Sequence, residues 1–216
     1  MDIVTEIGIK AEDSEMSGSD KAVLGLGRNE VRLSDHNPEW RRIADKTIVQ
    51  LWKVFGSAAE GIQHVGSTAI KHIKAKPDMV IVVGVKNLDV IDEILPRLHE
   101  IGISKMDQQS VPDTVKCGIT SENESGVHTQ YVLILIYNSI QWQNYVNFRD
   151  YLNAFPHKAA EYESLKISLA KQHPNDRKAY KNGKLAFFEK TYVEARIYKD
   201  AKPSNAQRNP PVKEQK

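Results

Sequence analysis

The chain has 216 residues, of which 40% are hydrophobic and 27% charged, a composition typical of a folded globular protein with a substantial core. Its 30 basic and 28 acidic residues leave a formal net charge of only +2, which argues against nucleic acid as a partner. No apolar run approaches the roughly 20 residues that a membrane-spanning helix needs, so we expect no membrane partner either.

The two ends of the chain differ in composition from its middle. Residues 1–25 are polar and acidic without sustained periodicity, and residues 200–216 combine prolines with basic and amide side chains. Segments of this kind cannot bury enough apolar surface to fold by themselves. The sequence therefore predicts a flexible N-terminal arm, one domain over residues 26–199 and a disordered basic tail.

The first elements of the domain are a short strand over 31–33 and a helix over 39–55. Asn37 is a typical N-cap with Pro38 at the first helical position, and apolar residues then recur at spacings of three and four. Trp40 lies in this apolar stripe, so we expect it to pack in the core, although a tryptophan can also stack on a base.

Residues 61–85 combine two apolar runs with a small polar turn. Ile62 to Val65 is typical of a strand, Gly66-Ser67-Thr68 of a tight turn, and Asp78 to Val85 of a buried β-branched strand. Glycine lets a phosphate come close to the backbone, and a hydroxyl follows it here. The same three residues also fit an ordinary turn with a helix cap.

The middle of the chain predicts a second helix over 88–101, short strands over 103–106 and 114–120, and a long strand over 128–137. The long strand is apolar on both faces from Tyr131 onward, so we expect it at the centre of the sheet. Cys117 is the only cysteine and is more typical of a buried small hydrophobe than of a nucleophile. With no signal-peptide pattern at the N-terminus, these features predict a cytoplasmic protein.

The last third of the domain is helical. Apolar residues predict a helix from about 142 to 152, a break at Pro156, a second helix, and a third helix from about 177 to 192. Strands followed by helices predict an α+β fold with a helical C-terminal third.

Several separated segments, all in one order, resemble the GrpB-like family, which is placed in the nucleotidyltransferase fold superfamily. They include Asn37-Pro38-Glu39-Trp40, His64-Val65-Gly66-Ser67-Thr68-Ala69, Ala75-Lys76-Pro77, Phe148-Arg149-Asp150-Tyr151-Leu152 and Pro174-Asn175-Asp176-Arg177. The resemblance implies a nucleotidyltransferase-like mixed sheet flanked by helices. It also implies that the Gly-Ser turn meets nucleotide phosphate and that acidic residues on the next strand bind a divalent metal.

The sequence departs from that pattern where the metal ligands are expected. Val80 and Val82 stand in place of the acids, and Asp78 is the only carboxylate on the strand. The long strand lacks the His-x-His-like pattern that is expected after a threonine. His128 stands alone, just upstream of Thr129. The resemblance therefore leaves Asp78 as the metal ligand and a catalytic residue, and we expect Mg²⁺ binding to be weak or absent.

His64 is a second catalytic candidate, as a base or phosphate contact, or it makes a structural hydrogen bond. The substrate-binding candidates are Gly66, Ser67, Thr68, Lys76, His128, Arg149, Lys166, Arg177 and Lys184. Lysines and arginines among them fit a cationic wall facing phosphate, or else an exposed helix surface or structural ion pairs.

These observations predict a protein that binds a nucleotide or a phosphorylated small molecule at the Gly66-Ser67 turn. If it is an enzyme, it transfers a nucleotidyl group, but the missing carboxylates put that chemistry in doubt. The alternatives are a catalytically silent binding module and a protein-interaction module that uses the helical third or the tail. The oligomeric state stays open.

Overall fold

The computed structural model describes residues 24–27, 29–106, 113–120 and 128–201. The predicted N-terminal arm and basic tail lie almost entirely outside these residues. The described residues form a five-stranded sheet with the spatial order β1-β2-β5-β4-β3. Its strands are β1 (Ala59–Val65), β2 (Met79–Val85), β3 (Ile103–Lys105), β4 (Thr114–Thr120) and β5 (His128–Ile136).

The sheet is mixed, and β5 lies in its centre as predicted. β5 pairs in parallel with β2 and antiparallel with β4, whereas the β1–β2 and β3–β4 pairs are antiparallel. Both faces of β5 are covered, because Val132 and Ile134 pack on one side and Leu133 and Leu135 on the other.

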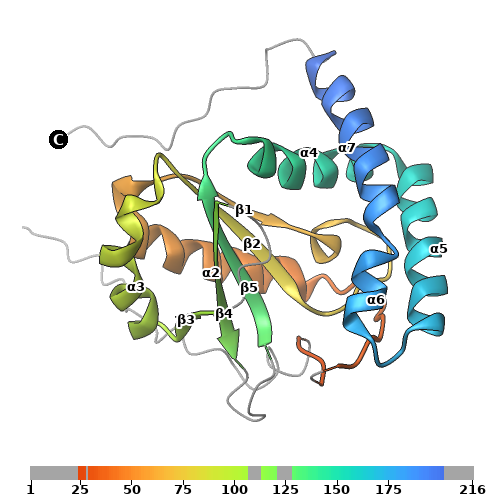
Figure 1. The fold of residues 1–216 in the computed structure, drawn as a ribbon, viewed down its shortest axis with the longest axis horizontal. Helices are drawn as coiled ribbons and strands as arrows, with labels where there is room; N and C mark the ends of the chain where they lie inside the picture. Colours follow the sequence, from red (N-terminus) through yellow and green to blue (C-terminus); the bar gives the residue numbers. More distant parts are fainter. Residues whose placement is uncertain (1–23, 28, 107–112, 121–127, 202–216) are drawn as a thin grey trace, which may run out of the picture.

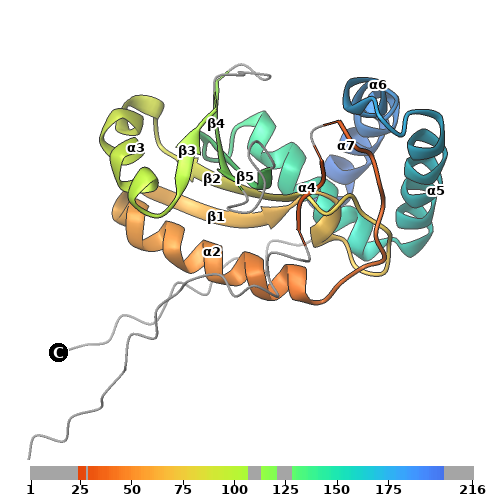
Figure 2. The same ribbon diagram turned by 90° about the horizontal axis from the view of Figure 1, so that it is seen from below.

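Helices cover both faces of the sheet and gather at one end of it (Figures 1 and 2). They are α2 (Glu39–Phe55), α3 (Ile91–Glu100), α4 (Ile140–Ala154), α5 (Pro156–Gln172), α6 (Arg177–Asn182) and α7 (Leu185–Asp200), with short 3₁₀ turns η1 (Gly56–Ala58), η2 (Ser67–Ala69) and η3 (Leu88–Val90). Figure 2 shows α2 below the sheet and α5, α6 and α7 grouped beside one end. The expected α+β fold with a helical C-terminal third is confirmed.

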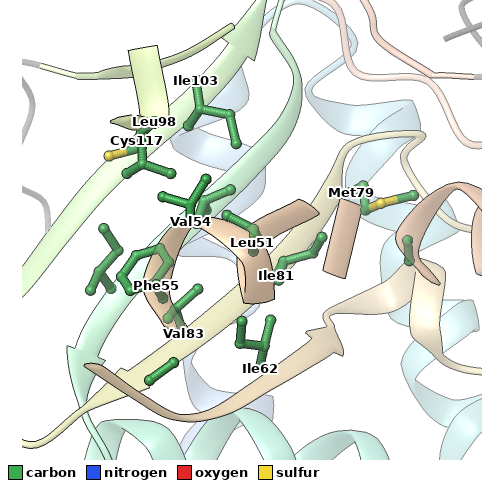
Figure 3. Close-up of a cluster of buried hydrophobic side chains, with 14 of the residues drawn as sticks. Leu51, Val54, Phe55, Ile62, Met79, Ile81, Val83, Leu98, Ile103 and Cys117 are labelled. Atoms are coloured by element: carbon green, nitrogen blue, oxygen red, sulfur yellow. The ribbon is translucent and has the colours of Figure 1, made fainter. Parts of the chain in front are cut away.

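The main core lies between α2 and the sheet. Leu51, Val54 and Phe55 of α2 meet Ile81 and Val83 of β2 (Figure 3). Alternate residues of a strand point to opposite faces, so this packing of Ile81 and Val83 turns the intervening residues of β2 away from α2. Trp40 is also buried in this cluster, which confirms its predicted packing role.

Cys117 belongs to the same core and is fully buried, as predicted. Burial raises the pKa of the Cys117 thiol to about 11, because a thiolate would lose its hydration there. The thiol is therefore protonated at neutral pH and serves as packing.

Two sequence predictions about local structure were wrong. Residues 31–33 form no strand, because Val31 instead packs against Leu169 and Tyr180 and its N–H donates to the Pro174 carbonyl at 2.7 Å. The expected single helix over 177–192 is two helices, α6 and α7, with a break at Gly183.

Close packing explains the glycine at this break. A Cβ atom on Gly183 would lie 2.4 Å from Leu169 Cδ2 of α5, well inside van der Waals contact. Glycine also weakens a continuous helix by about 1 kcal/mol relative to alanine. The break turns the chain at Lys184, the residue just before α7.

The range of α2 is the predicted 39–55, and only its N-terminal cap differs from the prediction. The helix begins at Glu39 and Pro38 is the residue that precedes it. Asn37 Oδ1 accepts a hydrogen bond from the Glu39 N–H at 2.9 Å, so its side chain still satisfies an N–H group at the start of the helix.

Candidate functional site

A large cleft of about 1260 Å³ is lined by the sheet face opposite α2 and by helices α4 to α7. Its walls are strongly cationic. Among the described residues that line it, Asp78 is the single acidic one and seven are basic, namely Lys76, Lys105, Lys116, Arg177, Lys178, Lys181 and Lys184. Seven aromatic side chains also line the cleft: Tyr131, Tyr145, Phe148, Tyr162, Tyr180, Phe188 and Tyr192.

The Gly66-Ser67 turn forms part of the cleft, as its sequence pattern suggested. Gly66 has a φ of 78°, a left-handed conformation that glycine adopts without strain. A Cβ atom there would contact Val80 at 3.5 Å, so the turn lies directly against β2. The turn and the start of β2 therefore share one wall of the cleft.

Thr68 and His64 lie beneath this turn and are absent from the cleft lining. Both are buried, and a hydrogen bond of 2.9 Å joins His64 Nε2 and Thr68 Oγ1. Burial, followed by the charge of Arg149, lowers the pKa of His64 to about 4. The neutral imidazole at pH 7 therefore links β1 to η2 and supports the turn from below.

Asp78 lies at the entrance to β2 and faces the cleft together with Val80. Its carboxylate forms an ion pair with Lys76, and its Oδ2 lies 3.4 Å from Arg177 Nη1. Oδ1 is buried and has no hydrogen-bond partner within the described part of the chain. Burial lowers the pKa of Lys76, and the neighbouring Asp78 charge opposes that shift.

The donor set around Asp78 does not fit a Mg²⁺ site. Mg²⁺ in phosphate-transfer sites is held by one or two carboxylates that are free to coordinate it, together with water and phosphate oxygens. Asp78 is already neutralised by Lys76 and Arg177, and the next residue on its face is Val80. Within the described ranges there is no cluster of three or more His, Cys, Asp or Glu side chains arranged to hold a metal.

Arg149 and Lys166 were expected among the substrate-binding residues, but neither lines the cleft. Arg149 Nη1 donates to Gln63 Oε1 at 2.9 Å and to the His64 carbonyl at 2.8 Å, which ties α4 to β1. His128 was also a substrate-binding candidate. Its side chain lies outside the described part of the structure, although its backbone begins β5.

Lys166 is only 1% exposed, and its ammonium donates to the Lys74 carbonyl and lies 4.6 Å above the Tyr162 ring. Burial, followed by the charge of Lys184, lowers the pKa of Lys166 to about 7. The contact with Lys74 holds α5 against the segment that leads into β2.

Arg177 and Lys184 both line the cleft, from opposite sides of the break between α6 and α7. Arg177 Nε donates to the Glu30 carbonyl at 3.2 Å, so it also fastens the segment before α2. Lys184 Nζ lies 4.5 Å from the centre of the Tyr180 ring and 5.4 Å from that of Phe188. Burial, then the charges of Lys76 and Lys181, lower the pKa of Lys184 to about 8.

Lys116 is a cleft residue that sequence reasoning missed. It lies on β4 between Val115 and Cys117, which both face the core under α2, so the period of two turns it into the cleft. Its Nζ lies 4.5 Å above the Tyr131 ring, and burial lowers its pKa. A lysine that alternates with buried residues on a strand was the available signal.

A family model described as GrpB protein matches residues 30–194, which is most of the chain. The chain belongs to the GrpB family. The glutamate-rich protein GrpB of Alkalihalophilus pseudofirmus is 36% identical over 168 residues, covering 77% of this chain and 97% of that protein. The protein YqkA of Bacillus subtilis is 28% identical over 169 residues, which cover 73% of this chain but only 45% of YqkA.

A solved structure shows the same fold. The conserved protein GrpB from Enterococcus faecalis matches with a TM-score of 0.69 at 24% identity, over 77% of this chain and 99% of that one. Nucleotidyltransferases occur among the more distant neighbours. A cytoplasmic RNA terminal U-transferase matches at a TM-score of 0.44 and the Cid1 poly(U) polymerase at 0.46, values too low to bear on ligand or activity.

Within the described residues, no helix combines the length and the apolar character that a bilayer crossing requires.

Proposed function

We propose that this GrpB-family protein binds a nucleotide or another phosphorylated small molecule in the cleft, and that it does so without a metal ion. The observation that carries the proposal is the charge of the cleft, where seven basic side chains surround one carboxylate. The chain as a whole carries a formal charge of only +2, so this excess is local.

Basic side chains can neutralise the charge of a phosphorylated ligand in place of a metal ion. Phosphate groups concentrate negative charge, and lysine and arginine neutralise it through short charge-assisted hydrogen bonds. Lys76 and Arg177 are held in place by Asp78, which fixes two of these cations at the edge of the Gly66-Ser67 turn. Pre-positioned cations lose little side-chain entropy when the ligand binds.

The aromatic side chains favour a ligand with a planar part. The centre of the Phe148 ring lies 5.2 to 5.9 Å from the ring centres of Tyr162, Phe188 and Tyr192. Stacking of a base on such side chains contributes about 1–3 kcal/mol. A nucleotide combines both features, with phosphate toward the cations and the base toward the rings.

Catalysis of nucleotidyl transfer is not part of the proposal, because Val80 and Val82 replace the carboxylates that would hold the metal. A binding module without nucleotidyl-transfer activity is the form that the cleft supports best. We place the protein in the cytoplasm, where nucleotides are available and a free thiol such as that of Cys117 stays reduced.

The test is a metal-free calorimetric titration with adenosine, AMP, ADP and ATP. Affinity should rise with each phosphate and fall as salt is added, since cations supply the binding energy. Lys181→Gln should weaken ATP binding about fivefold. The matched variant Lys190→Gln, at an exposed position outside the cleft lining, should leave it unchanged. Equal affinity for adenosine and ATP would contradict the proposal.

The interaction-module alternative has one observation in its favour. Val193 and Ile197 of α7, four residues apart on one side of the helix, are 59% and 65% exposed. Val193→Glu combined with Ile197→Glu would abolish a partner interaction made through this face. The same double variant should leave ATP binding intact if the cleft is the functional site.

A further inference from the structure

We propose that Lys184 is a nucleophilic amine that forms an imine with a phosphorylated aldehyde or ketone bound in the cleft. The inference rests on the proposed function, because the cationic wall would hold the phosphate of such a compound. It goes beyond that function by assigning a covalent step and a substrate class to one residue.

The position of Lys184 suits a reacting group. It lines the cleft at the break between α6 and α7, and its carbonyl accepts the Phe188 N–H at 3.0 Å in the first turn of α7. Gly183 packs against Leu169 and thereby fixes where this break occurs. The backbone that carries Lys184 is therefore held from both sides, and its side chain reaches into the same cavity as the Gly66-Ser67 turn.

The surroundings of Lys184 favour the neutral amine that imine formation requires. Burial and the positive charges of Lys76 and Lys181 destabilise its ammonium form, while the charge of Asp78 and the faces of the Tyr180 and Phe188 rings act in the opposite direction. The net effect lowers the pKa of Lys184 to about 8. Desolvation and a neighbouring cation are the two means by which lysine nucleophiles are activated in proteins.

The reaction is balanced without any further reactant. The Nζ lone pair attacks the carbonyl carbon while the C=O π electrons move to oxygen, giving a carbinolamine after one proton passes from nitrogen to oxygen. The nitrogen then expels that hydroxyl group, which leaves as water with a second proton, and a C=N bond forms. The Tyr180 and Phe188 rings beside Nζ provide flat apolar surfaces for a planar imine.

Other lysines near the cleft fit this role less well. Lys166 has a similarly lowered pKa of about 7, but it is 1% exposed and donates to the Lys74 carbonyl, so a substrate cannot reach it. Lys76 is ion-paired with Asp78, which favours its charged form. Lys184 has no carboxylate partner in the described part of the structure.

The experiment uses pyridoxal 5′-phosphate, a phosphorylated aldehyde, with the full chain. The protein is incubated with it at about pH 7.5, the imine is reduced with borohydride, and modified lysines are located by peptide mass spectrometry. At this pH the free-amine fraction of Lys184 exceeds that of an ordinary lysine on the order of a hundredfold. A less basic amine is also a weaker nucleophile, which reduces the difference in labelling rate by about tenfold. Lys184 should therefore be labelled about tenfold more than the exposed Lys190.

Three comparisons make the result specific. Lys184→Arg keeps a positive charge without a reactive amine and should lose the dominant adduct, whereas Lys190→Arg should retain it. Pyridoxal, which lacks the phosphate, should label Lys184 much less than pyridoxal 5′-phosphate does. Bound ATP should protect Lys184 from labelling, and circular dichroism of each variant establishes that it is folded.

The outcomes separate this inference from the proposed function. Labelling spread evenly over surface lysines, while metal-free ATP binding is measured by calorimetry, would overturn the role of Lys184 and leave the binding cleft intact. Absence of ATP binding together with equal labelling by pyridoxal and its phosphate would overturn both.

Discussion

Two faces of the sheet, one packed against α2 and the other lining the cleft, are built from alternate residues of the same strands. On β2, Ile81 and Val83 enter the apolar core, whereas Val80, like Asp78 just before the strand, lines the cleft. On β4, Val115 and Cys117 are buried against α2 and α3, while Lys116 and Gly118 face the cleft. The face toward α2 is largely apolar and closely packed, whereas the other face combines an apolar cluster, which includes Val82 and Leu133, with the charged side chain of Lys116.

This difference shows where stability and function are separated. The apolar face needs only volume and shape, and hydrophobic burial stabilises it. The cleft face also presents charged groups such as Lys116 to a cavity, where a ligand can reach them. Substitutions on the two faces should therefore have different consequences, in stability on one face and in binding on the other.

The largest effect on stability is expected on the apolar face. Leu51→Ala removes a fully buried side chain of α2 and should lower the free energy of unfolding by about 2–5 kcal/mol. Val49→Ala, at a position 55% exposed on the same helix, should change it by less than about 0.5 kcal/mol. Urea denaturation followed by circular dichroism measures both, and equal losses would mean that the assignment of the core is incorrect.

A second large effect concerns acid pH and the support of the turn. His64 has a folded-state pKa of about 4, below its ordinary value of 6.5, so between these values the unfolded chain binds a proton that the folded protein does not. Stability contributed by the neutral imidazole is complete above about pH 6.5 and is lost as pH falls toward 4, by about 3 kcal/mol. His64→Gln, which cannot titrate, should flatten this part of the stability curve, and the exposed control His99→Gln should not.

Lys166 should give a smaller effect on the alkaline side. With a folded-state pKa of about 7 against an ordinary 10.5, the unfolded chain binds more protons between these values, so stability rises with pH there. The gain between about pH 7 and pH 9 should be about 2 kcal/mol. Lys166→Met removes this contribution and should leave only the smaller rise that comes from Lys184, whose pKa is about 8, while the exposed Lys171→Met should keep the full rise. A rise in Lys166→Met as large as that in the native protein would refute this assignment.

The smallest effect is expected from a variant that tests whether basic side chains or a metal ion neutralise the ligand in the cleft. Val80→Asp adds a second carboxylate on the face of Asp78, two residues further along β2, and restores the spacing of a metal site. ATP binding should weaken without metal, and Mg²⁺ should then strengthen it about tenfold. Val80→Asn has the same size without the charge, so a Mg²⁺ response in that variant would show that the carboxylate is not responsible.

Much of the fold followed from local patterns. The structure contains α2, which its apolar stripe predicted, and the central strand β5, which its two apolar faces predicted. The predicted break at Pro156 is the boundary between α4 and α5. These signals are strong because burial of a helix stripe or a central strand constrains the sequence within one element. Residues 31–33 and the α6–α7 break were predicted incorrectly because contacts with α5 decide them, and such contacts have no local signal.

The candidate site could be predicted only in part for the same reason. Gly66, Ser67, Lys76 and Asp78 adjoin one turn and one strand, and the structure brings them together in the cleft. A matching pattern does not show which way a side chain on a distant helix points. Arg149 and Lys166 are turned toward structural partners, whereas Lys116 enters the cleft.

The most direct test of metal-free binding is calorimetric titration of ATP with and without Mg²⁺, on the native protein and on Asp78→Asn. We expect ATP to bind without Mg²⁺, with no gain when Mg²⁺ is added. Asp78→Asn should bind ATP a few-fold more tightly, because Lys76 and Arg177 lose their competing carboxylate. Binding that requires Mg²⁺ and disappears in Asp78→Asn would contradict this account and show that Asp78 holds a metal.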